Sequence, residues 1–153
     1  MSLLEALSPE NVICRFNATS KKHVLEHLAD QAAEQCGAAA RDILDAIIKR
    51  EKLGSTGIGA GFAIPHAVVE GVTDDFVVMA TLNNPITFDS LDQRPVDVIC
   101  MVLGAVGQTA SHVSTVAMAS QFLRQHGETV RGTGDAGAIL ENIGLTDADS
   151  AAA

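Results

Sequence analysis

A histidine at the end of a glycine- and hydroxyl-rich stretch is the feature of this sequence with the clearest chemical meaning. The stretch begins at Gly54 and ends with Ile-Pro-His66. Glycines let the backbone reach positive φ and approach an anion closely, while Ser55 and Thr56 offer hydroxyl and amide donors. Pro65 stiffens the residue just before the imidazole. This combination predicts that His66 carries a phosphoryl group on a ring nitrogen.

Other interpretations of the same stretch compete with this one. On the first, the glycines build a tight surface turn and His66 caps a strand. A phosphate loop of the Walker type needs a Gly-Lys-Ser/Thr sequence, and no lysine follows these glycines. The dinucleotide pattern G-x-G-x-x-G is absent between Gly57 and Gly61, and Pro65 opposes a helix after it. The surface turn stays open as the alternative, whereas a nucleotide-binding loop is disfavoured.

Several motifs together resemble one bacterial domain family. They are Ser20-Lys-Lys, Lys49 to Leu53 followed by Gly54-Ser-Thr-Gly-Ile-Gly, Ala63-Ile-Pro-His66, Pro85-Ile-Thr-Phe-Asp89, and Asp92 to Asp97. The combination resembles the fructose/mannitol-type IIA domain of the phosphoenolpyruvate-dependent phosphotransferase system, and the nitrogen-regulatory branch is the most similar. The resemblance extends over residues 3–143. It implies one domain over residues 1–145 and a disordered tail over residues 146–153.

The resemblance assigns roles to two histidines. It implies that His66 takes a phosphoryl group from a phosphohistidine on a small HPr-like carrier, with no metal and no other cofactor. It also places His112 beside His66, at the start of a helix whose N-terminus favours anions. The phosphate-binding residues expected around them are Ser55, Thr56, Gly61 and Ile64.

Arg50 is the third candidate for this site. A guanidinium can pair with two phosphoryl oxygens at once, whereas its alternative role is a surface charge near the end of a helix. The neighbouring Glu51 either orients Arg50 or is solvated. Ala60 stands where the family usually has asparagine, so one potential hydrogen bond near the loop is missing. The proline that is common ahead of His112 is also absent.

Three kinds of function follow from the resemblance. The favoured one is a regulatory phosphocarrier, a phosphotransferase component whose phosphorylation state controls target proteins such as a potassium transporter or a sensor kinase. The alternative is a sugar-specific IIA component that passes its phosphoryl group to a IIB cysteine for carbohydrate uptake. The third is a degenerate domain that binds partners without being phosphorylated. A chain with no IIB-like or membrane portion favours the regulatory branch.

Composition sets the broad class of the protein. The chain has 153 residues, 47% of them hydrophobic, so one domain with a substantial core is expected. No apolar run approaches the ~20 residues that span a bilayer, and the N-terminus lacks an export signal. The formal charge of -9 opposes nucleic-acid binding. Three cysteines without a Cys-x-x-Cys pair indicate free thiols, so a cytoplasmic protein without membrane insertion is expected, of open oligomeric state.

The hydrophobic pattern predicts an α/β protein, a three-layer α/β/α sandwich with a mixed central sheet. Residues 76–82 and 96–103 are β-branched apolar runs, which predicts strands buried on both faces. The other expected elements are a helical turn at 3–7, a strand at 11–16, and helices from Ser20 to Gly37, from Ile43 to Gly54, at 110–125 and at 135–142. The helix at 110–125 is expected to turn one side inwards, formed by Val113, Val116, Ala117, Ser120 and Leu123.

Three further histidines need an interpretation. His23-Val-Leu-Glu-His27 fits the zinc-peptidase pattern H-x-x-E-H, with two imidazoles four residues apart on one helical face. The pair lies beside two lysines in a short amphipathic helix without an identifiable third ligand, so it is interpreted as a solvated helix face. His126, followed by glycine, is interpreted as a helix C-terminal cap. No metal site is predicted.

Overall fold

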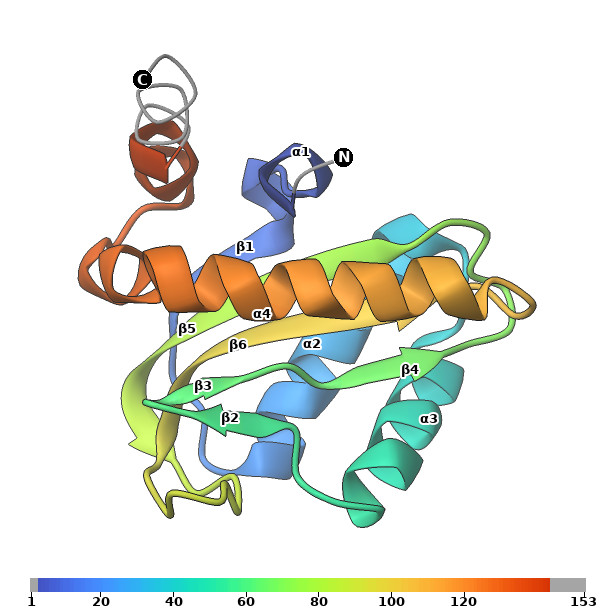
Figure 1. Cartoon of the computed structure of the whole chain (residues 1–153), viewed down its shortest axis with the longest axis horizontal. Coiled ribbons are helices and arrows are strands. Elements are labelled where there is room, and N and C mark those ends of the chain that lie inside the picture. The colour runs from blue at the N-terminus through green and yellow to red at the C-terminus, as the bar shows by residue number, and fades with distance from the viewer. Residues whose placement is uncertain (1–2, 144–153) are drawn as a thin grey trace.

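The computed structural model describes residues 3–143 (Figure 1). The helices are α1 (Leu3–Ala6), the 3-10 helix η1 (Pro9–Asn11), α2 (Lys21–Cys36), α3 (Ala40–Lys52), α4 (Thr109–Gly132) and a helical segment over 136–143. The strands are β1 (Val12–Phe16), β2 (Gly57–Gly59), β3 (Phe62–Ala63), β4 (His66–Val68), β5 (Phe76–Ile86) and β6 (Val96–Gly104). The predicted tail over 146–153 and the domain end at 145 lie outside the described residues.

The strands form one mixed sheet in the order β1-β5-β6-β3-β2, and β4 also pairs with β6. The central strands β5 and β6 are antiparallel, whereas β1 runs parallel to β5. Both β3 and β4 run parallel to β6, one after the other along the same edge. The predicted mixed central sheet is therefore confirmed.

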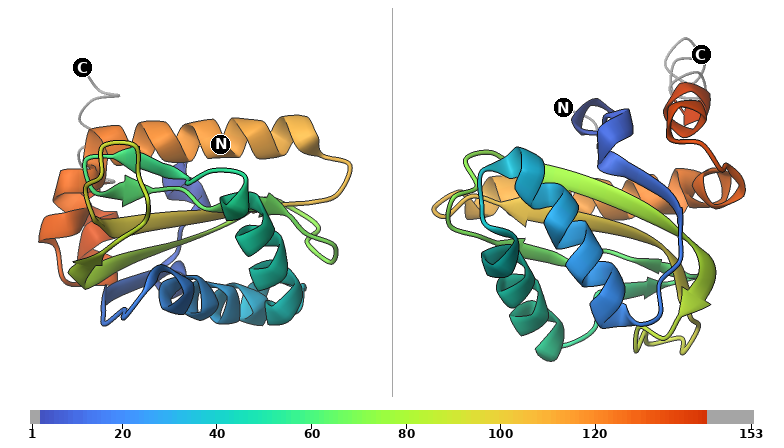
Figure 2. Two further views of the ribbon diagram at one scale, coloured as in Figure 1. Left: turned by 90° about the horizontal axis from the view of Figure 1, so that it is seen from below. Right: turned by 180° about the vertical axis from the view of Figure 1, so that it is seen from behind.

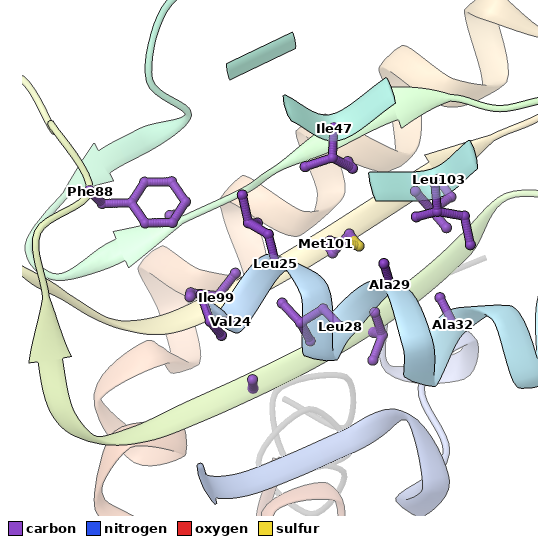
Figure 3. Packing of buried hydrophobic residues seen from close by; sticks show 14 of the residues in the cluster. Val24, Leu25, Leu28, Ala29, Ala32, Ile47, Phe88, Ile99, Met101 and Leu103 are labelled. Atoms are coloured by element: carbon purple, nitrogen blue, oxygen red, sulfur yellow. The ribbon is translucent and has the colours of Figure 1, made fainter. Parts of the chain in front are cut away.

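Helices cover both faces of this sheet, as Figure 2 shows, with α2 and α3 on one face and α4 on the other. Alternate residues of β6 point to opposite sides: Ile99 and Met101 join the core beneath α2 and α3, and Val98 and Cys100 join the core beneath α4. Figure 3 shows how the α2 side chains pack onto the first of these cores. The prediction that both central strands are buried on both faces is confirmed, and so is the three-layer arrangement.

Local signals explain where α2 and α3 begin and end. The Ser20 hydroxyl accepts a hydrogen bond from the His23 backbone N–H, and Gly37 ends α2 with a φ of 86°. Helix α3 ends at Lys52, where the Leu53 N–H still reaches the Arg50 carbonyl. The glycine stretch thus leaves directly from the last turn of α3, which carries Arg50.

The glycine stretch itself contains three short strands, although the sequence predicted a loop. Strands β2 and β3 form a small antiparallel hairpin, and β3 and β4 add to the edge of β6. Pro65 separates β3 from β4 because it has no N–H to donate, but its carbonyl still accepts from the Val102 N–H at 2.9 Å. These strands exist through pairing with β6, which a glycine-rich segment does not encode by itself.

Helix α4 differs most from its prediction. It continues to Gly132 instead of ending at residue 125, so the interpretation of His126 as a C-terminal cap is wrong. His126 is buried in the middle of the helix and lies against Phe122, with ring centroids 5.3 Å apart. The following Gly127 sits over the Phe62 ring, where a Cβ atom would come within 2.4 Å of the ring. This glycine serves close packing of helix on sheet, not helix termination.

Candidate active site

The structure brings His66 and His112 together. His66 is the first residue of β4, and His112 lies in the first turn of α4. Their ring centroids are 5.7 Å apart and their planes are tilted by 50°. Strand β6 holds both, since His66 is in register with Val102 and Gly104 packs directly against the His112 ring. Two residues far apart in the chain therefore meet at one end of the sheet.

One hydrogen bond determines the tautomer of His66. Its Nδ1 lies 2.8 Å from the carbonyl oxygen of Ile64. A carbonyl oxygen can only accept, so Nδ1 carries the hydrogen. In the neutral ring Nε2 is then left with a free lone pair, which is the form needed of a nucleophile. The half-buried ring of His66 is thus oriented with Nε2 as its reactive nitrogen.

His112 is more deeply buried than His66, with 7% of its surface exposed. Its Nδ1 atom is buried and has no hydrogen-bond partner among the described residues. Burial lowers the pKa of His112, the nearby His66 lowers it further, and Asp75 acts in the opposite direction. His112 is therefore neutral near pH 7 while the site is empty.

This lowered pKa predicts that stability falls in acid. The unfolded chain, where histidine has its ordinary pKa of 6.5, takes up a proton at a pH where folded His112 does not. Because the unfolded state then binds more protons, the free energy of unfolding decreases as the pH drops below about 6.5. Urea unfolding at several pH values tests this, and His112→Gln should flatten the slope. An unchanged slope in that variant would show that His112 is not the responsible group.

A buried network holds the start of the glycine stretch in place. The Glu51 carboxylate accepts from the Thr56 backbone N–H at 3.2 Å and also from the Thr56 hydroxyl. Lys21 lies 2.9 Å from the same carboxylate, which has only 6% of its side chain exposed. Both proposed roles of Glu51 are corrected by these contacts: it is not solvated, and its printed partners are Thr56 and Lys21, not Arg50. Its function is to fix the loop onto the ends of α2 and α3.

The predicted phosphate donors are engaged within the loop. The Ser55 hydroxyl donates to the Phe88 carbonyl at 2.6 Å, and the Ile64 N–H donates to the Thr56 carbonyl at 3.0 Å. Ser55, Thr56 and Ile64 nonetheless line the same pocket as His66. Gly61 does not: it lies in the turn between β2 and β3, beside Arg131. Here the hairpin carries the chain away from the histidines, so Gly61 is the one candidate that the structure leaves outside the site.

The pocket beside His66 has a volume of about 420 Å³. Arg50 lines it and donates through Nη1 to the Gly54 carbonyl at 2.8 Å. The opposite wall comes from α4 and was missed as a site by the sequence prediction: Val113, Val116, Ala117 and Ser120.

These α4 residues had been predicted as the inward side of the helix. Val113 is 60% exposed, and the residues that pack on the sheet are instead Thr115, Ala119, Phe122, Leu123, His126, Gly127 and Val130. The buried face includes histidine, threonine and glycine, which a purely apolar pattern does not identify. The signal that was available is that Val113 directly follows His112.

The histidines of the zinc-peptidase pattern pack against Phe16. The His27 ring is stacked on the Phe16 ring at 4.1 Å, and the His23 ring lies tilted at 5.1 Å from it. Both imidazoles are half-buried, so the interpretation as a solvated face is wrong in that respect. Among residues 3–143, no three His, Cys, Asp or Glu side chains lie close enough to hold a metal ion. No helix in that range is long and apolar enough to cross a membrane.

Comparison with known proteins adds independent information. Residues 5–131 match the family model described as "Phosphoenolpyruvate-dependent sugar phosphotransferase system, EIIA 2". A nitrogen regulatory protein of Bradyrhizobium diazoefficiens is 34% identical over 153 residues, covering 99% of this chain and 100% of the relative. One from Escherichia coli K12 is 38% identical over 124 residues, covering 80% and 76%. The crystal structure of nitrogen regulatory protein IIA-Ntr from Neisseria meningitidis has a TM-score of 0.81 at 26% identity, covering 90% and 98%.

Proposed function

The chain belongs to the EIIA 2 family of the phosphoenolpyruvate-dependent sugar phosphotransferase system, and from this premise we propose that it is a phosphohistidine carrier of the nitrogen-regulatory branch. In this proposal His66 accepts a phosphoryl group from an HPr-like carrier, and the phosphorylation state of His66 regulates target proteins. The observation that carries the proposal is the hydrogen bond from His66 Nδ1 to the Ile64 carbonyl, which leaves Nε2 as the acceptor.

The transfer step exchanges one N–P bond for another. The Nε2 lone pair of His66 attacks the phosphorus of the carrier's phosphohistidine, a new N–P bond forms, and the bond to the carrier's imidazole breaks. Because donor and acceptor are both imidazoles, the step needs positioning and charge stabilisation more than acid or base catalysis. The first turn of α4, which carries His112, contributes the positive end of a helix dipole beside the transferred group.

The pocket also suggests how phosphorylation is read by a partner. Ile58 and Val113 line the pocket and are 38% and 60% exposed, which provides an apolar contact area around His66. A phosphoryl group adds a charge of about −1.5 to −2 in the middle of that area. Targets that dock on apolar contacts would be disfavoured by this charge, whereas targets with a cationic contact would be favoured. Potassium transporters and sensor kinases stay the classes of target proposed.

The proposal is tested by phosphorylation in a purified system. Incubation with enzyme I, an HPr-like carrier and phosphoenolpyruvate should introduce acid-labile, base-stable phosphate, which NMR assigns to Nε2 of His66. Phosphate on Nδ1 would contradict the role given to Ile64. The labelled protein is then mixed with fructose- and mannitol-type IIB domains. Rapid transfer to a IIB cysteine would support the sugar-specific alternative and contradict the purely regulatory role.

Arg50→Lys should slow phosphoryl transfer about tenfold. Lysine keeps the positive charge but loses the planar fork, which binds two oxygens and also holds the Gly54 carbonyl. The measurement is the single-turnover rate of labelling from the phosphorylated carrier. Lys49→Arg, one residue earlier on an exposed position, is the control and should leave the rate unchanged. An unaltered rate in Arg50→Lys would assign Arg50 to the surface of α3 only.

A further inference from the structure

Asp75 connects the segment before β5 to the first two turns of α4. Its Oδ2 atom accepts from the Ser111 hydroxyl and from the Thr115 hydroxyl, each at 2.6 Å. These two residues lie on either side of His112 along the helix. One carboxylate therefore holds the part of α4 that carries the second histidine of the site.

Two buried polar atoms in this region have no hydrogen-bond partner among the described residues. One is the other carboxylate oxygen, Oδ1 of Asp75, and the other is Nδ1 of His112. Leaving such atoms unpaired in a buried place is costly, and native structures rarely do so without a functional reason. The two atoms are complementary, because an imidazole N–H can donate to a carboxylate oxygen.

We propose that Asp75 is a positioning residue that acts as the counter-ion of His112, so that His112 becomes protonated when His66 carries a phosphoryl group. Nδ1–H of the imidazolium then donates to Asp75 Oδ1, and Nε2–H is free to donate to a phosphoryl oxygen. The added proton comes from solvent, and no other bond forms or breaks. For the phosphorylated state this inference rests on the proposed function.

The charges around His112 explain why protonation would follow phosphorylation. In the empty site burial disfavours the imidazolium, and the facing groups that titrate or carry charge are His66 from β4 and Asp75 from the segment before β5. The first turn of α4 contains no acidic residue that could add to them. A phosphoryl group on His66 replaces a neutral neighbour by an anion, so His112 then lies between two negative groups.

The decisive experiment follows the imidazole signals of His112 by NMR as the pH is varied. Asp75→Asn keeps an oxygen that accepts from Ser111 and Thr115 but removes the charge. We expect the pKa of His112 to fall by about one pH unit in this variant. Asp74→Asn removes a neighbouring, exposed carboxylate and should leave the pKa of His112 as in the wild type. Equal pKa values in the two variants would overturn the proposal.

A second variant separates charge from support of the helix. Ser111→Ala removes one hydrogen bond to Asp75 but keeps the carboxylate, so the pKa of His112 should stay within the wild-type range. A drop as large as in Asp75→Asn would overturn the counter-ion role and leave a structural one. If Asp75→Asn does not fold, the wild type decides alone: His112 signals should show a second inflection where Asp75 titrates, and its absence refutes the contact.

The phosphorylated protein provides the functional readout. Phosphorylation should raise the pKa of His112 in the wild type, and Asp75→Asn should move the acid limb of the transfer rate to lower pH by about one pH unit, while Asp74→Asn does not. An unmoved acid limb in Asp75→Asn would contradict the proposal. Should the wild type take up no phosphate, the proposed function fails, whereas the pKa of His112 in the free protein still decides the role of Asp75.

Discussion

Replacing His66 by alanine is expected to abolish phosphoryl labelling of this protein. The variant removes the Nε2 atom whose lone pair the Ile64 contact leaves free, and His112 cannot substitute because its buried Nδ1 atom lies against Gly104. Removing a nucleophile of this kind costs at least about 10³-fold in rate, because no other group supplies the covalent step. The measurement is the single-turnover transfer from the phosphorylated HPr-like carrier.

The matched control is His27→Ala. This variant also removes one half-buried imidazole, but its ring stacks on Phe16 and does not line the pocket. It should be labelled at the wild-type rate. Circular dichroism and urea unfolding establish that both variants are folded. Labelling of His66→Ala at more than a few per cent of the wild-type rate, with phosphate on His112, would transfer the acceptor role and refute the assignment.

The second large effect is expected from Gly104→Ala. A Cβ atom on Gly104 would lie 2.5 Å from Nδ1 of His112 and 2.8 Å from its Cβ. The clash involves the base of the His112 side chain, so rotating the ring does not relieve it, and the first turn of α4 must move. Overpacking of this kind costs about 1–3 kcal/mol of unfolding free energy. A displacement of His112 by about 1 Å should also slow phosphoryl transfer on the order of 10²-fold.

Gly127→Ala provides a control with a similar clash at the far end of the same helix. Its Cβ atom would come within 2.4 Å of the Phe62 ring, far along α4 from His112. We expect Gly127→Ala to lose stability as well but to keep nearly the wild-type transfer rate at a temperature where it is folded. Equal transfer rates in the two glycine variants would show that the position of His112 does not limit the reaction.

Several elements could be predicted because their information is local. The Ser20 cap and Gly37 enclose α2, and the two apolar β-branched runs became β5 and β6, the strands that both cores bury. The family motifs were equally local, and the family comparison confirmed them. Strands β2 to β4 were not predicted, because two or three residues of glycine-rich chain become a strand only through the hydrogen bonds of β6. The side of α4 that faces the sheet was wrong because polar residues occupy it.

The amino-acid sequence by itself determined the family, the α/β layers and His66 as the candidate acceptor, since these depend on contiguous motifs and on the period of apolar residues. Only the tertiary structure decided the tautomer of His66, the attachment of Glu51 to Thr56, the position of Gly61 outside the site and the contact of Asp75 with α4. The Asp75 contact joins residues 36 and 40 positions apart. Which polar atoms become buried partners depends on how the layers pack, and that packing is a property of the whole fold.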